Sequence, residues 1–123
     1  MLSIETRRAA EDFARALRQS PTIVALQAAE AALDADPQAQ ALMDELRRLQ
    51  QAFIAAQRAG QPAPPDVAEA LRTCQSDVRR NELIMAQLRA TNEAKAFLPL
   101  VAAEVTRALG TDYATLIKPS GCC

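Results

Sequence analysis

Residues 42–56 read LMDELRRLQQAFIAA, and large apolar side chains recur in this stretch at alternating steps of four and three. This spacing places them along one side of an α-helix and is typical of a seam on which two helices pack. The sequence therefore predicts a long helix over residues 37–59 with one apolar face. The seam residues are Leu42, Leu46, Leu49, Phe53 and Ala56.

A second seam with the same spacing follows after a short connection. The connection begins at Gly60, a residue type that often ends helices, and continues through the proline-rich residues 61–65. Two seams joined in this way predict an antiparallel helical hairpin. At about 1.5 Å per residue, we expect two arms of similar length, each about 35 Å long. The second seam consists of Val67, Leu71, Cys74, Val78, Asn81, Met85 and Leu88.

Helical periodicity extends to both sides of the hairpin. Ser20 and Asp36 are each followed by proline, which combines a good N-cap with a residue that suits the first helical position. These two points predict where helices begin. The helices predicted before the hairpin cover residues 3–18 and 21–34.

Beyond the hairpin the boundaries are less defined. Asn92 either caps a fifth helix or lies within a continuing one, and Pro99 predicts a kink or a helix start. Gly110 ends the last helix, and residues 111–123 have the composition of a flexible tail. We therefore predict an all-α bundle of about five helices, built on the long hairpin, in a single domain of residues 1–110.

The composition predicts a thin core. Aromatic residues make up 3% of the chain, and Trp is absent. Large aromatic side chains usually supply much of the core energy, so this core depends on Leu, Val, Ile and Ala. We therefore expect an oligomer, a homodimer in the first instance, that completes the core across an interface.

Charge and hydropathy exclude several classes of protein. The net charge is −1 with both signs interspersed, which argues against a general nucleic-acid binder. No apolar run approaches the roughly 20 residues that span a bilayer. Charged residues interrupt residues 1–8 and no apolar segment follows, so we expect no signal peptide and a cytoplasmic protein. Arg72, Arg79 and Arg80 form either solvated surface or a basic patch for an acidic partner or RNA.

Groups that commonly carry catalysis are missing from the sequence. The chain has no His, which removes the commonest general base and metal ligand, and its three Gly are isolated. Pairs of carboxylates such as Asp34 and Asp36 are explained by helix caps and solvated faces. We therefore expect a binding protein without catalytic residues.

Asn81 is the one polar residue of the second seam. A buried Asn in such a seam fixes helix register or oligomeric state. Asn81 is therefore a candidate register or interface residue, with a direct partner contact or simple exposure as the alternatives.

Three cysteines remain to be explained. Cys74 lies in the seam and is expected to act as a small buried apolar residue, with metal ligation as the alternative. Cys122 and Cys123 end the chain, and thiolates suit zinc, copper(I) and iron–sulfur clusters. Two thiols do not complete a four-ligand site, so a metal here needs thiols from Cys74, a second subunit or a partner. The other interpretations are a dispensable tail and a prenylation signal.

The order and spacing of these elements, more than any one of them, carry a family resemblance. They start at Ser20-Pro21, include Asp36-Pro37 and Gly60, and extend to Gly110. The further positions are Leu33, Ala39, Leu42, Leu46, Gln50, Gln57, Leu71, Val78, Asn81, Ile84, Leu88, Leu100, Val101, Val105 and Leu109. In this pattern the chain resembles the YlbF/YmcA family of small bacterial helical regulators.

The resemblance implies a helical bundle that forms oligomers and has no enzymatic activity. Members of that family assemble with related helical proteins into a complex that binds an endoribonuclease and alters RNA processing. Members of that complex bind iron–sulfur clusters partly through cysteines near their C-termini, and Cys122 and Cys123 are the positions here that could match. This chain lacks the spaced cysteine run.

Three functions follow from the sequence. The first is a regulatory adaptor that displays a helical face to protein partners. The second is a thiol-based metal or iron–sulfur protein that uses Cys122 and Cys123. The third is a holdase-like helical chaperone that grips unfolded clients.

Overall fold

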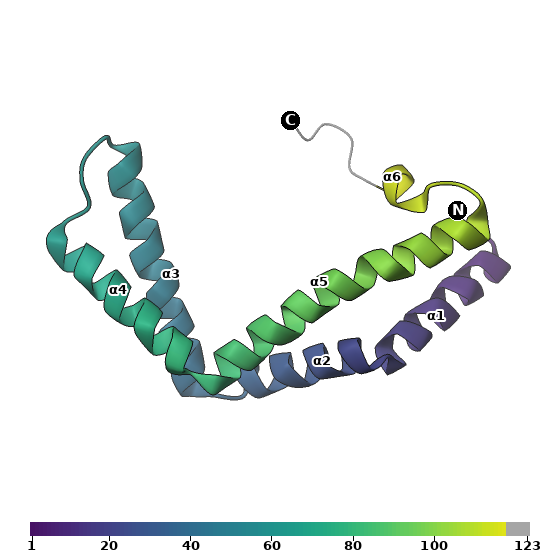
Figure 1. Cartoon of the computed structure of the whole chain (residues 1–123), viewed down its shortest axis with the longest axis horizontal. Helices are drawn as coiled ribbons and strands as arrows, with labels where there is room; N and C mark the ends of the chain where they lie inside the picture. The colour runs from purple at the N-terminus through teal and green to yellow at the C-terminus, as the bar shows by residue number, and fades with distance from the viewer. Residues whose placement is uncertain (118–123) are drawn as a thin grey trace. The chain divides into compact units, whose positions relative to one another are not determined.

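A computed structural model describes residues 1–117 and folds them into six α-helices, without strands in that range (Figure 1). The prediction of an all-α protein is confirmed. Within these residues, no helix combines the length and hydropathy needed to span a membrane. The helices are α1 (Ile4–Gln19), α2 (Pro21–Asp34), α3 (Pro37–Arg58), α4 (Pro65–Arg80), α5 (Glu82–Leu109) and α6 (Tyr113–Ile117).

Contacts between residues divide the chain into two compact units. Ala25–Arg89 form one unit, here named the hairpin unit, and Met1–Val24 with the described residues from Ala90 to Ile117 form the other, here named the terminal unit. Helices α2 and α5 each contribute residues to both units. The single domain expected over residues 1–110 stays a prediction.

The hairpin unit is built on α3 and α4, which pack against each other (Figure 1). All five residues of the first seam are buried or half-buried, and Leu49 is buried most deeply. From the second seam, Val67, Leu71, Cys74 and Val78 are likewise withdrawn from solvent. The predicted hairpin is confirmed because the two apolar stripes meet.

A glycine ends α3 as the sequence indicates. Gly60 has a φ of +69°, a left-handed conformation that only glycine adopts without strain. Its N–H donates to the carbonyl of Gln57, and the N–H of Gln61 donates to the carbonyl of Ala56, both at 3.0 Å. These two hydrogen bonds form a Schellman motif, which satisfies the last carbonyls of the helix and turns the chain toward α4.

At the other end of α3, three apolar side chains from different helices make a small core. Leu33 of α2, Ala39 of α3 and Ile84 of α5 are each at most 6% exposed. The Asp36 carboxylate accepts a hydrogen bond from the Ala39 N–H at 3.0 Å, which confirms the predicted cap of α3. Half-buried side chains surround this core, namely Leu42, Met43, Val78 and Leu83.

The helix is interrupted at Asn81, so the prediction of one continuous helix through the second seam is wrong. Asn81 has a φ of −83° and a ψ of 113°, so it lies between α4 and α5 in extended conformation. Its side-chain oxygen accepts a hydrogen bond from the Ile84 N–H at 3.0 Å. Because α4 has only 16 residues, it is about 24 Å long and shorter than the expected arm.

In the terminal unit, α1 runs beside the C-terminal part of α5 (Figure 1). Ser3 caps α1 by accepting a hydrogen bond from the Thr6 N–H at 3.1 Å. Ser20 differs from its predicted role, because its hydroxyl donates to the Leu17 carbonyl at 2.6 Å and so closes α1. Its carbonyl accepts from the Val24 N–H, which starts α2.

Helix α5 continues through Asn92 and Pro99, so the alternatives of a helix start at either residue are wrong. Gly110, with a φ of +78°, follows its last residue as predicted. The next residues depart from the expected flexible tail, because Tyr113–Ile117 form α6. The Asp112 carboxylate caps that helix by accepting from the Thr115 N–H at 3.3 Å, a local bond that the sequence analysis overlooked.

Candidate functional site

The hairpin unit contains an open cleft between α3 and α4. Acidic side chains surround its apolar floor, and the cleft volume is about 470 Å³. An adjoining hollow shares Leu42, Glu45 and Asp77 with this cleft and extends to Arg80 and Asn81. The cleft is lined by Leu42, Glu45, Leu49, Asp66, Glu69, Ala70, Thr73, Cys74 and Asp77.

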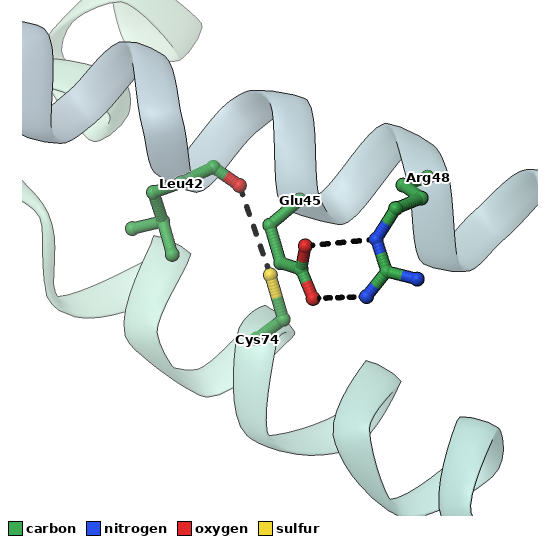
Figure 2. Close-up of polar contacts among 4 residues, drawn as sticks. All are labelled: Leu42, Glu45, Arg48 and Cys74. Atoms are coloured by element: carbon green, nitrogen blue, oxygen red, sulfur yellow. Dashed lines mark hydrogen bonds and ion pairs between the residues drawn. The ribbon is translucent and has the colours of Figure 1, made fainter.

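Cys74 connects the two helices at the floor of this cleft. Its Sγ donates to the backbone carbonyl of Leu42 at 3.7 Å (Figure 2). The residue is 5% exposed, which confirms the prediction of a packed seam cysteine. Burial raises the pKa of the Cys74 thiol, and the carboxylates of Glu45 and Asp77 raise it further. The thiol therefore stays protonated at neutral pH and is a poor nucleophile.

Glu45 is fixed beside the cleft by Arg48, one turn further along α3. Arg48 donates from Nε at 3.0 Å and from an Nη at 2.6 Å to the two oxygens of Glu45 (Figure 2). These hydrogen bonds, with the charge of the guanidinium, hold the pKa of Glu45 below its usual range. Since both side chains are solvent-exposed, the pair orients a carboxylate at the rim and adds little to stability.

Among residues 1–117, no three His, Cys, Asp or Glu side chains gather closely enough to hold a metal ion. Cys122 and Cys123, the candidate metal ligands, lie outside the described residues. Arg72, Arg79 and Arg80 are exposed, which fits both solvated helix surface and a basic patch, so the two alternatives stay predictions.

Asn81 occupies a different position from the one predicted. It is half-buried at the junction of α4 and α5 and lines the hollow next to Arg80. In this chain the Asn81 side chain caps the first turn of α5, and its role in helix register stays a prediction. Its proposed role at an interface stays a prediction.

The terminal unit has a groove that the sequence analysis did not identify. Helices α1, α5 and α6 enclose it, its volume is about 480 Å³, and Lys95 is its one charged lining residue among those described. The sequence signal for the α6 side of the groove is the helical spacing of Tyr113, Ala114 and Ile117, which the prediction of a flexible tail ignored. The lining residues are Phe13, Leu17, Lys95, Leu98, Pro99, Val101, Ala102, Val105, Tyr113, Ala114 and Ile117.

Large apolar side chains around this groove face solvent. Phe13 is 43% exposed, Leu98 45% and Ile117 58%. Within the described part of the unit, the buried apolar residues are two alanines, Ala90 and Ala94. A contiguous apolar surface of this kind is typical of an interaction site and not of a finished core.

Comparison with known proteins places this chain in a family. Comparison with curated proteins gives no match. The fold is similar to a chain in the crystal structure of Bacillus subtilis RicA in complex with RicF, with a TM-score of 0.71 and 21% sequence identity. The similarity covers 89% of this chain and 96% of that one. Residues 7–110 match the family described as "Control of competence regulator ComK, YlbF/YmcA". The chain therefore belongs to the YlbF/YmcA family.

Proposed function

We propose that this protein is a non-enzymatic regulatory adaptor that acts through protein–protein contacts in the cytoplasm. The observation that carries the proposal is the apolar groove of the terminal unit, where Phe13, Leu98 and Ile117 are each more than 40% exposed. Exposed apolar surface costs free energy in water, and a protein partner that covers it recovers that energy.

Membership of the YlbF/YmcA family supports a regulatory role. The family is described by its control of a competence regulator, and the RicA structure holds two proteins in complex. By analogy, we propose that this chain assembles with itself or with related helical proteins. The assembly then binds an endoribonuclease and alters RNA processing, and direct contact with nucleic acid or membrane is not expected.

The test is affinity capture from the native cytoplasm without oxygen, followed by mass spectrometry. The baits are the wild-type chain, Leu98→Glu in the groove and Leu88→Glu as a control. Leu88 suits this purpose because it lies on the same helix, is equally exposed at 45%, and is outside the groove. The proposal expects the wild type and the Leu88→Glu control to recover a ribonuclease or related helical proteins in stoichiometric amounts. Leu98→Glu should recover less of them.

A second measurement addresses RNA processing. Transcript ends are mapped in cells with and without the protein, and in cells that carry each leucine variant. The proposal expects the same altered ends in the deletion and in Leu98→Glu, with Leu88→Glu close to wild type. Unchanged transcript ends together with capture of the bait alone would overturn the endoribonuclease role.

A thiol-based metal or iron–sulfur function is the alternative that the two terminal cysteines favour. Cys122→Ser with Cys123→Ser provides the test. Visible absorption and bound iron in protein purified without oxygen, lost in this double variant, would support the alternative. A holdase function predicts instead broad suppression of aggregation among unrelated client proteins.

A further inference from the structure

The cleft between α3 and α4 differs in charge from the groove of the terminal unit. Its charged lining residues among those described are all acidic, namely Glu45, Asp66, Glu69 and Asp77. Of these four, only Glu45 forms an ion pair within residues 1–117, with Arg48. Negative charge that is gathered in one cleft and left without a basic partner favours a cationic ligand.

The floor of the same cleft is apolar. Leu42 and Leu49 of α3 line it together with Ala70 and Cys74 of α4. Burial raises the pKa of the Cys74 thiol, and two carboxylates of the rim raise it further, so their negative potential reaches this floor. A ligand that fits both features carries an apolar group beside its positive charge, as a basic peptide does and an inorganic cation does not.

The carboxylates are spread along α4, so one small cation cannot meet them all. Asp66 and Asp77 lie toward opposite ends of this helix, about 16 Å apart along its axis at roughly 1.5 Å per residue. A peptide in extended conformation covers that distance with about five residues. The cleft volume of about 470 Å³ falls within the size range of ligand-binding clefts. The spacing therefore fits a short stretch of chain with several basic residues.

We propose that the cleft between α3 and α4 binds a basic segment of a protein partner. Its arginine or lysine side chains pair with Asp66, Glu69 and Asp77, and an apolar side chain between them packs on the floor. Glu45 contributes less, because Arg48 already compensates its charge (Figure 2). RNA is disfavoured, since its phosphates carry the same sign of charge as the cleft. The inference rests on the proposed adaptor role, for which it supplies a second surface, in the hairpin unit.

Binding of a labelled synthetic peptide to the purified full chain tests this inference. The probe has about ten residues, with leucines placed between arginines, and fluorescence anisotropy measures its dissociation constant. Two control peptides carry glutamate in place of every arginine, or serine in place of every leucine. Each control should bind weaker by roughly fivefold or more. Affinity for the probe should also fall by roughly fivefold or more between about 50 and 300 mM salt, because exposed charges are screened.

A matched pair of substitutions tests whether the probe binds in the cleft. Glu69 and Glu30 are both exposed glutamates of the hairpin unit without an ion pair among the described residues, and Glu30 lies outside the cleft. Glu69→Lys should raise the dissociation constant of the probe by roughly fivefold or more. Glu30→Lys changes the net charge equally and should leave that constant within about twofold.

A second measurement uses the unaltered protein, so the inference stays testable if Glu69→Lys fails to fold. Backbone amide chemical shifts are followed by NMR as the probe is added, and residues 66–77 should shift whereas those of α2 should not. Three outcomes overturn the inference. These are equal affinity for the glutamate peptide, an equal loss of affinity in both lysine variants, and a response of residues 66–77 to single-stranded RNA but not to the probe. The capture experiment with Leu98→Glu tests the adaptor role separately, through the groove of the terminal unit.

Discussion

The side-chain oxygen of Asn81 accepts a hydrogen bond from the backbone N–H of Ile84 at 3.0 Å. The bond ties the break between α4 and α5 to the core, because Ile84 packs with Leu33 and Ala39. Asn81 thereby determines where α5 begins and how Ile84 enters the hairpin unit.

This relationship predicts the effect of substitutions at Asn81. Asn81→Ala should lower the free energy of unfolding by about 1 kcal/mol, because the first turn of α5 loses its side-chain acceptor. Asn81→Ser should retain most of the stability. Urea unfolding followed by circular dichroism measures both. Asn81→Leu separates capping from a seam position: capping predicts a loss of stability, whereas a gain would restore the seam interpretation.

The buried thiol of Cys74 predicts a dependence of stability on pH. Its pKa in the folded protein lies above the ordinary value of 9.0, so the folded state keeps its proton where the unfolded state loses it. The contribution of this thiol to the free energy of unfolding is constant below about pH 9 and is lost as pH rises through the folded pKa. The wild type should therefore lose more stability than Cys74→Ala between pH 8 and pH 10.5.

The comparison with Cys74→Ala is matched, since Cys122 and Cys123 are present in both proteins. At pH 7, Cys74→Ala should be less stable by about 1 kcal/mol, because a buried sulfur is replaced by a smaller group. Parallel pH profiles for the two proteins would contradict a raised pKa at this residue.

Because Gly60 has a left-handed backbone conformation, we expect any side chain at this position to lower the stability of the folded protein. Gly60→Ala should lower the free energy of unfolding by about 1–2 kcal/mol. No atom lies within 4 Å of the added Cβ position, so the cost is in the backbone and not in packing. Gly60→Asn should cost less, since Asn tolerates this conformation better. Equal stability of the Ala variant and the wild type in urea would refute the predicted strain.

The pair formed by Glu45 and Arg48 predicts that the pKa of Glu45 depends on Arg48. Hydrogen bonds from Arg48 lower the pKa of Glu45, so Arg48→Gln should raise that pKa toward its usual value. Carboxyl chemical shifts in an NMR titration report the pKa of Glu45 directly. The Coulombic part of the difference in Glu45 pKa between the wild type and Arg48→Gln should shrink at 1 M salt, because both side chains are exposed. A Glu45 pKa insensitive to Arg48→Gln would show that the pair does not persist in solution.

Local patterns in the sequence determined most of the secondary structure. Each of these signals depends only on residues a few positions away. They are the seam from Leu42 to Ala56, the cap at Asp36 and the glycine at Gly60 that ends α3. Such signals are readable because helix formation and capping depend on neighbours three and four positions apart. The family membership was also readable, since it follows from the order of these same elements.

The tertiary structure decided what no local pattern contains. The spacing from Val78 to Met85 is equally compatible with one helix and with two, and contacts of Ile84 with Leu33 and Ala39 accompany the break at Asn81. The groove joins Phe13 to Val105 and Ile117, which are far apart along the chain. Sequence periodicity reports which face of a helix is apolar. Only the packing of helices shows which of those faces remains uncovered.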